Sequence, residues 1–232
     1  MKKINELIKL PEVRTIFDLF NNQGIYLVGG CIRDTLSGKE VTDIDFAVDI
    51  DPEEVIKILT NNNIKFYDIG INYGTVTAVI DSKNFEITSL REDIETDGRH
   101  AKVKYTSDIK ADSLRRDFTI NAIYANRDGE LFDFHNGLED IENRRLKFIG
   151  SASDRVKEDY LRILRYFRFY ADFSNFDIDA DLKKVFKEGS KNFSKISKER
   201  IWTELKKIIN HNNSFKSLSM MNEANILTEI SD

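Results

Sequence analysis

The apolar pattern of the chain changes once, a little past its middle. Up to about residue 145, short runs typical of strands, including residues 25–28 and 75–80, are interleaved with helical patterns. Beyond Gly150, only helical periodicity remains. The sequence therefore predicts a part with mixed helices and strands, followed by an all-helical part.

Helices are predicted where apolar residues recur at three- and four-residue spacing. These are residues 4–20, 52–59, 113–122, 151–172, 180–188, 197–209 and 214–224. Trp202 falls on the apolar face of one of these helices and is predicted to lie in the core. By contrast, the polar segment 91–112 has no clear periodicity and is long for a loop, so we predict that it is mobile or functional.

The composition of the 232-residue chain excludes several classes of protein. Its apolar runs are at most about six residues long, far short of the roughly 20 that cross a bilayer. Cys31 is the single cysteine and three histidines accompany it, so neither a disulfide scaffold nor a structural zinc cluster is expected. We predict a cytoplasmic protein with no membrane partner.

The net charge of −5, from 35 Lys and Arg against 40 Asp and Glu, hides a division along the chain. Residues 1–140 contain 17 basic and 26 acidic residues, a net of −9, whereas residues 141–232 contain 18 and 14, a net of +4. The basic excess is concentrated at residues 183–207, which carry nine Lys or Arg and three Glu. This stretch is either a solvated helix face or a functional basic surface.

Two aspartates, Asp43 and Asp45, alternate on a strand predicted over residues 43–48. Their side chains would therefore point to one face, with Cβ atoms roughly 6 to 7 Å apart. Hard cations such as Mg²⁺ take carboxylate oxygens and leave other positions for water and phosphate. Glu86, on the next predicted hairpin, is a candidate third ligand. Taken alone, such a pair of aspartates is more often a solvated strand face.

Gly29 and Gly30 separate a predicted strand from a short helix. Such a turn exposes backbone N–H groups to an anion, and Arg33 can add a charge-assisted contact to a phosphate. A glycine pair before a helix is usually only a turn. Followed within a short distance by Asp43 and Asp45, it predicts an anion-binding turn beside a metal site.

A row of charged residues occurs in the helix predicted over residues 151–172. Asp159, Arg162, Arg165 and Arg168 recur there at three-residue spacing. Residues three apart share a helix face, so the four side chains would lie along one side. Alone, this pattern is more often a row of surface ion pairs.

Four segments together resemble one family. Residues 27–34, Leu-Val-Gly-Gly-Cys-Ile-Arg-Asp, with Asp43-Ile44-Asp45 look like the head motif of class II tRNA nucleotidyltransferases and bacterial poly(A) polymerases, in the polymerase β superfamily. Residues 115–122 resemble the ribose-reading motif of the family, residues 158–162 its E-D-x-x-R motif, and residues 196–200 its neck-helix motif.

The resemblance implies an α+β fold. A nucleotidyltransferase (polymerase β-like) head, with a small mixed or antiparallel sheet flanked by helices, would occupy residues 1–145, and an all-α neck residues 146–232. Members of the family usually continue past the neck into further helical domains, so the resemblance covers the head, the neck and the start of the next domain.

The resemblance also implies roles for individual residues. Catalysis and a two-ion Mg²⁺ site fall to Asp43 and Asp45, with Glu86 as a further catalytic candidate. The nucleotide-binding residues would be Gly30, Arg33, Arg116, Asp117, Asn121, Asp159, Arg162, Arg165 and Arg168. Among these, Asp159 and Arg162 would read the base.

The implied activity is addition of CMP and AMP, from CTP and ATP, to the 3′ end of tRNA with release of pyrophosphate. Two alternatives share this chemistry: A-only addition, as in a poly(A) polymerase or A-adding enzyme, and CC addition. A third belongs to another class, a non-catalytic RNA-binding relative. The intact Asp43, Asp45, Arg33 and Arg162 argue against that third alternative.

Overall fold

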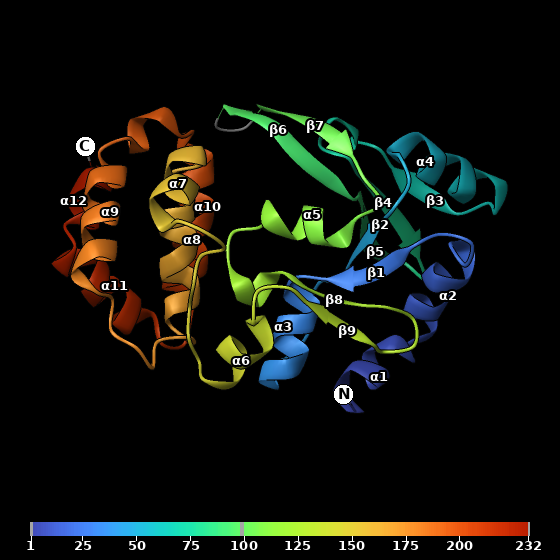
Figure 1. Ribbon diagram of the computed structural model, residues 1–232, viewed down its shortest axis with the longest axis horizontal. Helices are drawn as coiled ribbons and strands as arrows, with labels where there is room; N and C mark the ends of the chain where they lie inside the picture. Colours follow the sequence, from blue (N-terminus) through green and yellow to red (C-terminus); the bar gives the residue numbers. More distant parts are fainter. Residues whose placement is uncertain (1, 98–99, 232) are drawn as a thin grey trace. The chain divides into compact units, whose positions relative to one another are not determined.

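The computed structural model describes residues 2–97 and 100–231 (Figure 1). These residues form two compact units. The N-terminal unit runs to Ile94 and resumes over Lys102–Leu138, and the C-terminal unit comprises the chain from Glu139 together with the segment 95–101. Within the described ranges, no helix is long and apolar enough to cross a membrane.

The N-terminal unit is built on a seven-stranded sheet of order β3-β4-β5-β2-β1-β8-β9 (Figure 1). Its strands are β1 (Ile25–Val28), β2 (Asp45–Val48), β3 (Lys65–Tyr67), β4 (Thr75–Ile80), β5 (Lys83–Ser89), β8 (Ile123–Ala125) and β9 (Leu131–Asp133). Strands β2 and β5 pair in parallel and the other neighbours are antiparallel. The predicted mixed sheet is confirmed.

Two registers align residues at the centre of this sheet. Val28, the last residue of β1, lies opposite Asp45, and Asp45 lies opposite Glu86 of β5. Asp43 precedes β2, so the predicted strand over residues 43–48 begins two residues later than expected. Because β1, β2 and β5 are neighbouring strands, the glycine turn after β1 lies near the carboxylates of β2 and β5.

Helices of the N-terminal unit supply much of its core. They are α1 (Lys2–Ile8), α2 (Pro11–Leu19), α3 (Gly30–Ser37), α4 (Pro52–Asn61) and α5 (Ile109–Leu114), with 3₁₀ turns at η1 (Ile71–Tyr73) and η2 (Thr119–Asn121). Phe17 of α2 packs edge-on against Phe46 at a ring distance of 5.5 Å. The single helix predicted over residues 4–20 is wrong, because Pro11 starts a second helix at a position where its missing N–H is tolerated.

The segment 91–112 is not a loop. It contains a two-stranded sheet of β6 (Arg91–Asp97) and β7 (His100–Tyr105), followed by most of α5. Residues 98 and 99 lie outside the described part of the chain. Strand pairing satisfies backbone groups whatever the side chains are, so a polar ribbon can form without the apolar alternation that would have revealed it.

The helix predicted over residues 113–122 is also wrong. Helix α5 ends at Leu114, and the chain then passes through η2 into β8. Asp117 accepts the backbone N–H of Phe118 at 2.9 Å and the side-chain amide of Asn121 at 3.1 Å. Such local bonds compete with helical ones and favour a turn.

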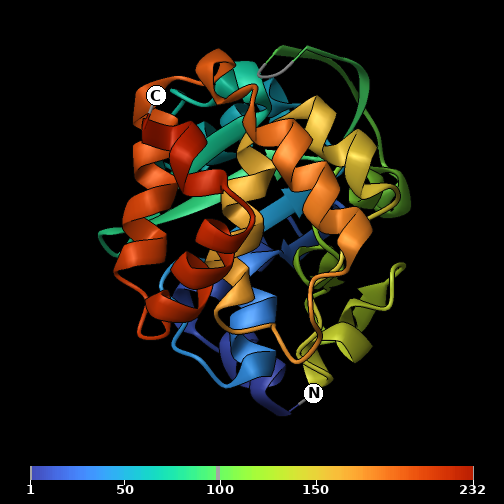
Figure 2. The same cartoon turned by 90° about the vertical axis from the view of Figure 1, so that its left-hand side faces the viewer.

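Apart from segment 95–101, the C-terminal unit is helical, as predicted (Figures 1 and 2). It contains α7 (Ala152–Glu158), α8 (Leu161–Tyr170), α9 (Ala180–Ser190), η3 (Phe193–Lys195), α10 (Lys198–Ile209), α11 (Ser214–Glu223) and α12 (Ile226–Ser231), while α6 (Gly137–Glu142) spans the boundary between the units. Helix α8 contacts α7, α9, α10 and α11. It buries Tyr166 and Phe167, whose rings lie 4.8 and 5.4 Å from that of Phe186.

Two predictions for this unit are wrong. The helix expected over residues 151–172 is broken at Asp159, which is extended with φ −153° and ψ 107°. Trp202 is 55% exposed rather than buried, although Ile208 on the same helix is buried. Periodicity identifies an apolar helix face, but it does not establish how far other elements cover that face.

Candidate functional site

The glycine turn lies against three of the predicted site residues. Gly29 has φ +76° at the N-terminus of α3, a conformation that favours glycine. A Cβ added there would lie 3.6 Å from Nη1 of Arg116 and 3.8 Å from the carbonyl oxygen of Asn121. At Gly30, a Cβ would lie 3.7 Å from Nη2 of Arg33. The turn and both arginines therefore form one polar surface.

Hydrogen bonds connect the residues around this turn. Nη1 of Arg33 donates to Oδ1 of Asn121 at 2.6 Å, and the Asn121 amide donates to Asp117 at 3.1 Å. Arg33 also donates from Nε and Nη2 to both carboxylate oxygens of Asp34, at 2.9 and 2.7 Å. The side chain of Arg33 is thus fixed from two sides.

The carboxylates of Asp43, Asp45 and Glu86 lie close enough to this surface for their charges to interact with its arginines. Burial and then the charges of Glu86 and Asp43 raise the pKa of Asp45 to about 6, against the opposing charges of Arg116 and Arg33. Asp43 is exposed and accepts a hydrogen bond from the Thr42 hydroxyl at 3.1 Å. Within the described residues, no three or more His, Cys, Asp or Glu side chains gather closely enough to hold a metal ion by themselves.

Asp112 is a residue of the site region that the sequence did not reveal. It is fully buried, and its Oδ1 accepts from Nε of Arg115 at 2.8 Å and from the backbone N–H of Arg91 at 3.1 Å. Its Oδ2 accepts from the Tyr124 hydroxyl at 2.7 Å and from Nη2 of Arg116 at 3.1 Å. Arg116 is therefore held in place by a carboxylate beneath it.

The charge state of Asp112 follows from these contacts. Burial disfavours its ionised form, but the charges of Arg116 and Arg115, together with the hydrogen bonds from Tyr124 and the Arg91 backbone, outweigh that effect and lower its pKa to about 2. Arg116 also lies over the Tyr124 ring, 5.1 Å from its centroid. The spacing of an acid three and four residues before two arginines was a signal for this cluster, hidden by the interpretation of segment 91–112 as a loop.

In the C-terminal unit, the two predicted base-reading residues have separate partners. Oδ2 of Asp159 accepts from Nη2 of Arg200 at 2.7 Å, and its Oδ1 accepts from the backbone N–H of Leu161 at 3.1 Å. Arg162 instead binds Glu158 and donates to the carbonyl oxygen of Arg155 at 3.0 Å. Because Asp159 lies in the break between α7 and α8, it does not share one helix face with Arg162 as predicted.

The other two arginines of this row lie on α8. Arg168 donates to both carboxylate oxygens of the buried Glu204, at 3.1 and 3.2 Å, and its guanidinium lies 4.3 Å from the Phe169 ring centroid. The Cζ atom of Arg165 lies 5.9 Å from the centroid of the same ring. Sequence reasoning missed Glu204 because 36 residues separate it from Arg168.

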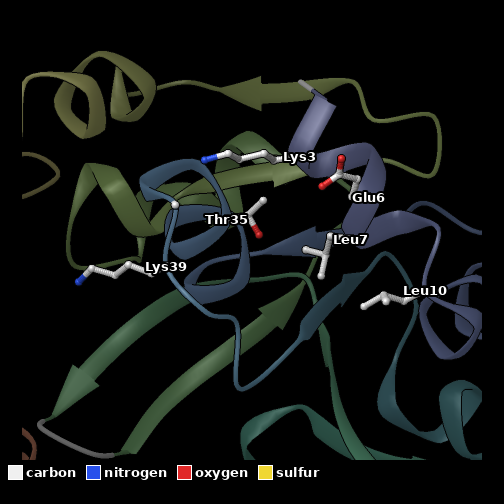
Figure 3. Close-up of a pocket in the computed structure, with 7 residues that line it drawn as sticks. Lys3, Glu6, Leu7, Leu10, Thr35 and Lys39 are labelled. Atoms are coloured by element: carbon white, nitrogen blue, oxygen red, sulfur yellow. The ribbon is translucent and has the colours of Figure 1, made fainter.

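A pocket of about 380 Å³ opens at the other end of α3 (Figure 3). Thr35, Gly38 and Lys39 line it from α3 and the turn that follows, and Lys3 and Glu6 line it from α1. None of the predicted site residues lines this pocket. The candidate site lies instead at the N-terminal end of α3, where Arg33 and Arg116 adjoin the glycine turn and the first backbone N–H groups have no helical partners.

Comparison with known families gives the same assignment. The family model described as "Poly A polymerase head domain" matches residues 25–147, more than half of the chain. The chain belongs to the poly(A) polymerase head-domain family. A second model, described as "Probable RNA and SrmB-binding site of polymerase A", matches residues 175–231. The family resemblance predicted from four motifs is confirmed.

Known relatives of this family member are named for CCA addition. "CCA tRNA nucleotidyltransferase 1, mitochondrial" of Homo sapiens is 43% identical over 221 residues, which cover 89% of this chain and 51% of the relative. The crystal structure of the Bacillus stearothermophilus CCA-adding enzyme in complex with CTP superposes with a TM-score of 0.81 at 28% identity, covering 94% of this chain and 53% of that one.

A third similar structure was solved with RNA bound. A tRNA nucleotidyltransferase complexed with a primer tRNA and an incoming ATP analog has a TM-score of 0.74 at 27% identity, covering 93% of this chain and 61% of that one. The chain spans about half the length of the curated relative and of these solved structures. The predicted nucleotidyltransferase fold is confirmed by these likenesses.

Proposed function

We propose that this chain forms the nucleotidyltransferase head and neck of an enzyme that adds CMP and AMP, from CTP and ATP, to the 3′ end of tRNA. The observation that carries the proposal is the assembly of the glycine turn, Arg33 and Arg116 beside the carboxylates of Asp43 and Asp45. Relatives named for this reaction, one solved with CTP and another with a primer tRNA, support it.

The phosphates of the nucleotide would bind at the N-terminus of α3. Its first backbone N–H groups, including that of Gly30, carry partial positive charge, and Arg33 and Arg116 add two full charges beside them. Asn121 fixes Arg33, and Asp117 fixes Asn121 in turn. We assign Asp117 and Asn121 to positioning this arginine and contacting the ribose.

The donor set beside this site fits Mg²⁺. Asp43 and Asp45 offer hard carboxylate oxygens, and Glu86 adds a third negative charge opposite Asp45. Mg²⁺ needs only one or two protein carboxylates when substrate phosphates complete its coordination. When bound, two such ions lower the pKa of the RNA 3′-hydroxyl and neutralise the departing pyrophosphate.

Base selection would fall to the C-terminal unit. The Asp159 carboxylate accepts from an exocyclic amine, and the Arg162 guanidinium donates to ring nitrogen and oxygen acceptors. Cytosine and adenine both present an amine beside a ring nitrogen, so one such pair accepts both and leaves guanine and uracil unpaired. Arg165 and Arg168 would help to hold the nucleotide.

Two further assignments belong to the proposal. We place the boundary between the head and the neck near residue 145. We also place the protein in the cytoplasm, although the human relative is named as mitochondrial.

The test is extension of a tRNA transcript that ends before CCA, in Mg²⁺ with CTP alone, ATP alone and both. The proposal expects addition of C, C and then A, read on a sequencing gel. A single A added only after CC, a long A tail, addition of C alone, or no growth would each overturn it in favour of one alternative.

The same assay tests the site. Asp43→Asn should reduce incorporation by at least about a thousandfold with an unchanged circular dichroism spectrum, because it removes a charged metal ligand. Asp51→Asn, at an exposed aspartate before α4, is the matched control and should extend RNA normally. An Asp43→Asn variant with the normal rate would show that the carboxylate assignment is wrong.

A further inference from the structure

The only tryptophan of the chain lies on the surface of the C-terminal unit. Trp202, on α10, is 55% exposed, far more than a tryptophan in a core. The exposed ring is not part of the nucleotide site described above. Its surroundings indicate what it can bind.

Two lysines flank the ring along the helix. Lys198 and Lys206 lie four residues before and four residues after Trp202, so all three share one exposed face of α10. The ammonium group of Lys206 lies 6.0 Å from the centroid of the ring. Across the described parts of the chain, neither lysine has an ion-pair partner, so both charges are available to an anion.

The charge of the wider region agrees with this arrangement. Residues 183–207 carry nine basic and three acidic residues, within a unit whose sequence has a positive net charge. The centre of a protein–protein interface usually contains few lysines. A flat aromatic ring between lysines is instead the arrangement that binds single-stranded nucleic acid, through base stacking and phosphate contacts.

We propose that Trp202 stacks on an unpaired base of single-stranded RNA, while Lys198 and Lys206 contact phosphates on either side. Eight residues of helix separate the lysines by roughly 12 Å, which their long side chains can adjust to neighbouring phosphates. The inference rests on RNA being the substrate, as proposed above. The family match over residues 175–231 includes RNA binding in its description but assigns no residue to it.

The first test uses the fluorescence of Trp202, which is the sole tryptophan signal of the chain. Titration with a ten-nucleotide cytidine oligomer, without nucleotides, should quench its emission by at least half as the base stacks. A 12-base-pair RNA duplex should quench it far less, because its bases are already stacked. The absence of quenching by the oligomer would overturn the proposal.

Variants separate stacking from simple apolar contact. Trp202→Leu should weaken binding of a fluorescein-labelled cytidine oligomer about tenfold by anisotropy, whereas Trp202→Tyr should stay within about threefold. Changing Lys198 and Lys206 together to Ala should reduce the magnitude of the slope of log affinity against log salt by about 1.4, about 0.7 for each phosphate contact on a single strand. A leucine variant that binds as tightly as the wild type would exclude stacking.

The assay also distinguishes this inference from the proposed function. It requires no catalysis, so Asp43→Asn should bind and quench like the wild type even though it cannot extend RNA. A chain that fails to add nucleotides but shows these effects would leave the inference standing. A blue shift of Trp202 emission with protein concentration alone would instead identify this face as a contact between copies and overturn it.

Discussion

Arg33 donates a 2.6 Å hydrogen bond to Asn121, a residue 88 positions away in the chain. The contact joins the glycine turn after β1 to the 3₁₀ turn before β8. Strands β1 and β8 are antiparallel neighbours in the sheet, so the turn after β1 and the turn before β8 lie at the same end of the two strands. The bond leaves the guanidinium oriented before any ligand binds, which reduces the entropy cost of holding a phosphate.

Asn121→Ala should therefore weaken nucleotide binding more than it slows the chemistry. Loss of a hydrogen bond to a charged group costs about 1.5 to 3 kcal/mol, so the KM for CTP should rise at least about tenfold while kcat changes less. Steady-state incorporation assays with varied CTP measure both. Asn61→Ala, at an exposed asparagine on α4, is the control. An unchanged KM for CTP would contradict the positioning role.

The sequence predicts this N-terminal fold where local pattern and tertiary structure agree. Strands β1 and β4 have the predicted bounds, because a continuous apolar run on β1 and alternating buried residues on β4 face a core. The prediction fails over residues 109–122, where the buried Asp112 and the turn-forming Asp117 make contacts that local periodicity does not encode. Trp202 was misplaced for the opposite reason, since its helix face is only partly covered.

The candidate site divides in the same way. Motif order predicts that Gly30, Arg33 and Asn121 belong together, and they do lie together. The ion-pair partners of the C-terminal unit were not predictable from spacing, because Arg200 lies 41 residues from Asp159 on another helix. Only packing of α10 against α8 creates that pair.

The buried carboxylate of Asp112 should make stability depend on pH. Its pKa is lowered from 3.8 to about 2, which corresponds to about 2 kcal/mol of stabilisation above pH 4. The contribution is lost as pH falls from about 4 toward 2, because the unfolded chain then binds a proton at Asp112 while the folded carboxylate stays ionised. Asp112→Asn should thus lower the free energy of unfolding by about 2 kcal/mol at pH 7.

Urea unfolding at several pH values measures this effect. The difference between wild type and Asp112→Asn should be constant from pH 7 to pH 5 and shrink below pH 4. Asp18→Asn, which breaks an exposed pair with Arg127 at 2.9 Å, should change stability little. A difference for Asp112→Asn that stayed constant down to pH 2.5 would show that the ionised carboxylate is not the source of the stability.

The pair of Asp159 and Arg200 should control which bases are accepted. Their 2.7 Å bond fixes one carboxylate oxygen, and the backbone N–H of Leu161 fixes the other, so the carboxylate of Asp159 has one orientation. Removing the guanidinium frees it to rotate. Arg200→Ala should raise the KM for both CTP and ATP about tenfold and reduce discrimination against UTP about tenfold, which a purely structural role would not do.

Arg200→Lys keeps the charge and should recover part of the discrimination. Lys191→Ala, which breaks an exposed pair with Glu188 at 3.0 Å in the same unit, is the control. If competition assays with mixed CTP and UTP gave the wild-type ratio for Arg200→Ala, Asp159 would not depend on Arg200 for base selection.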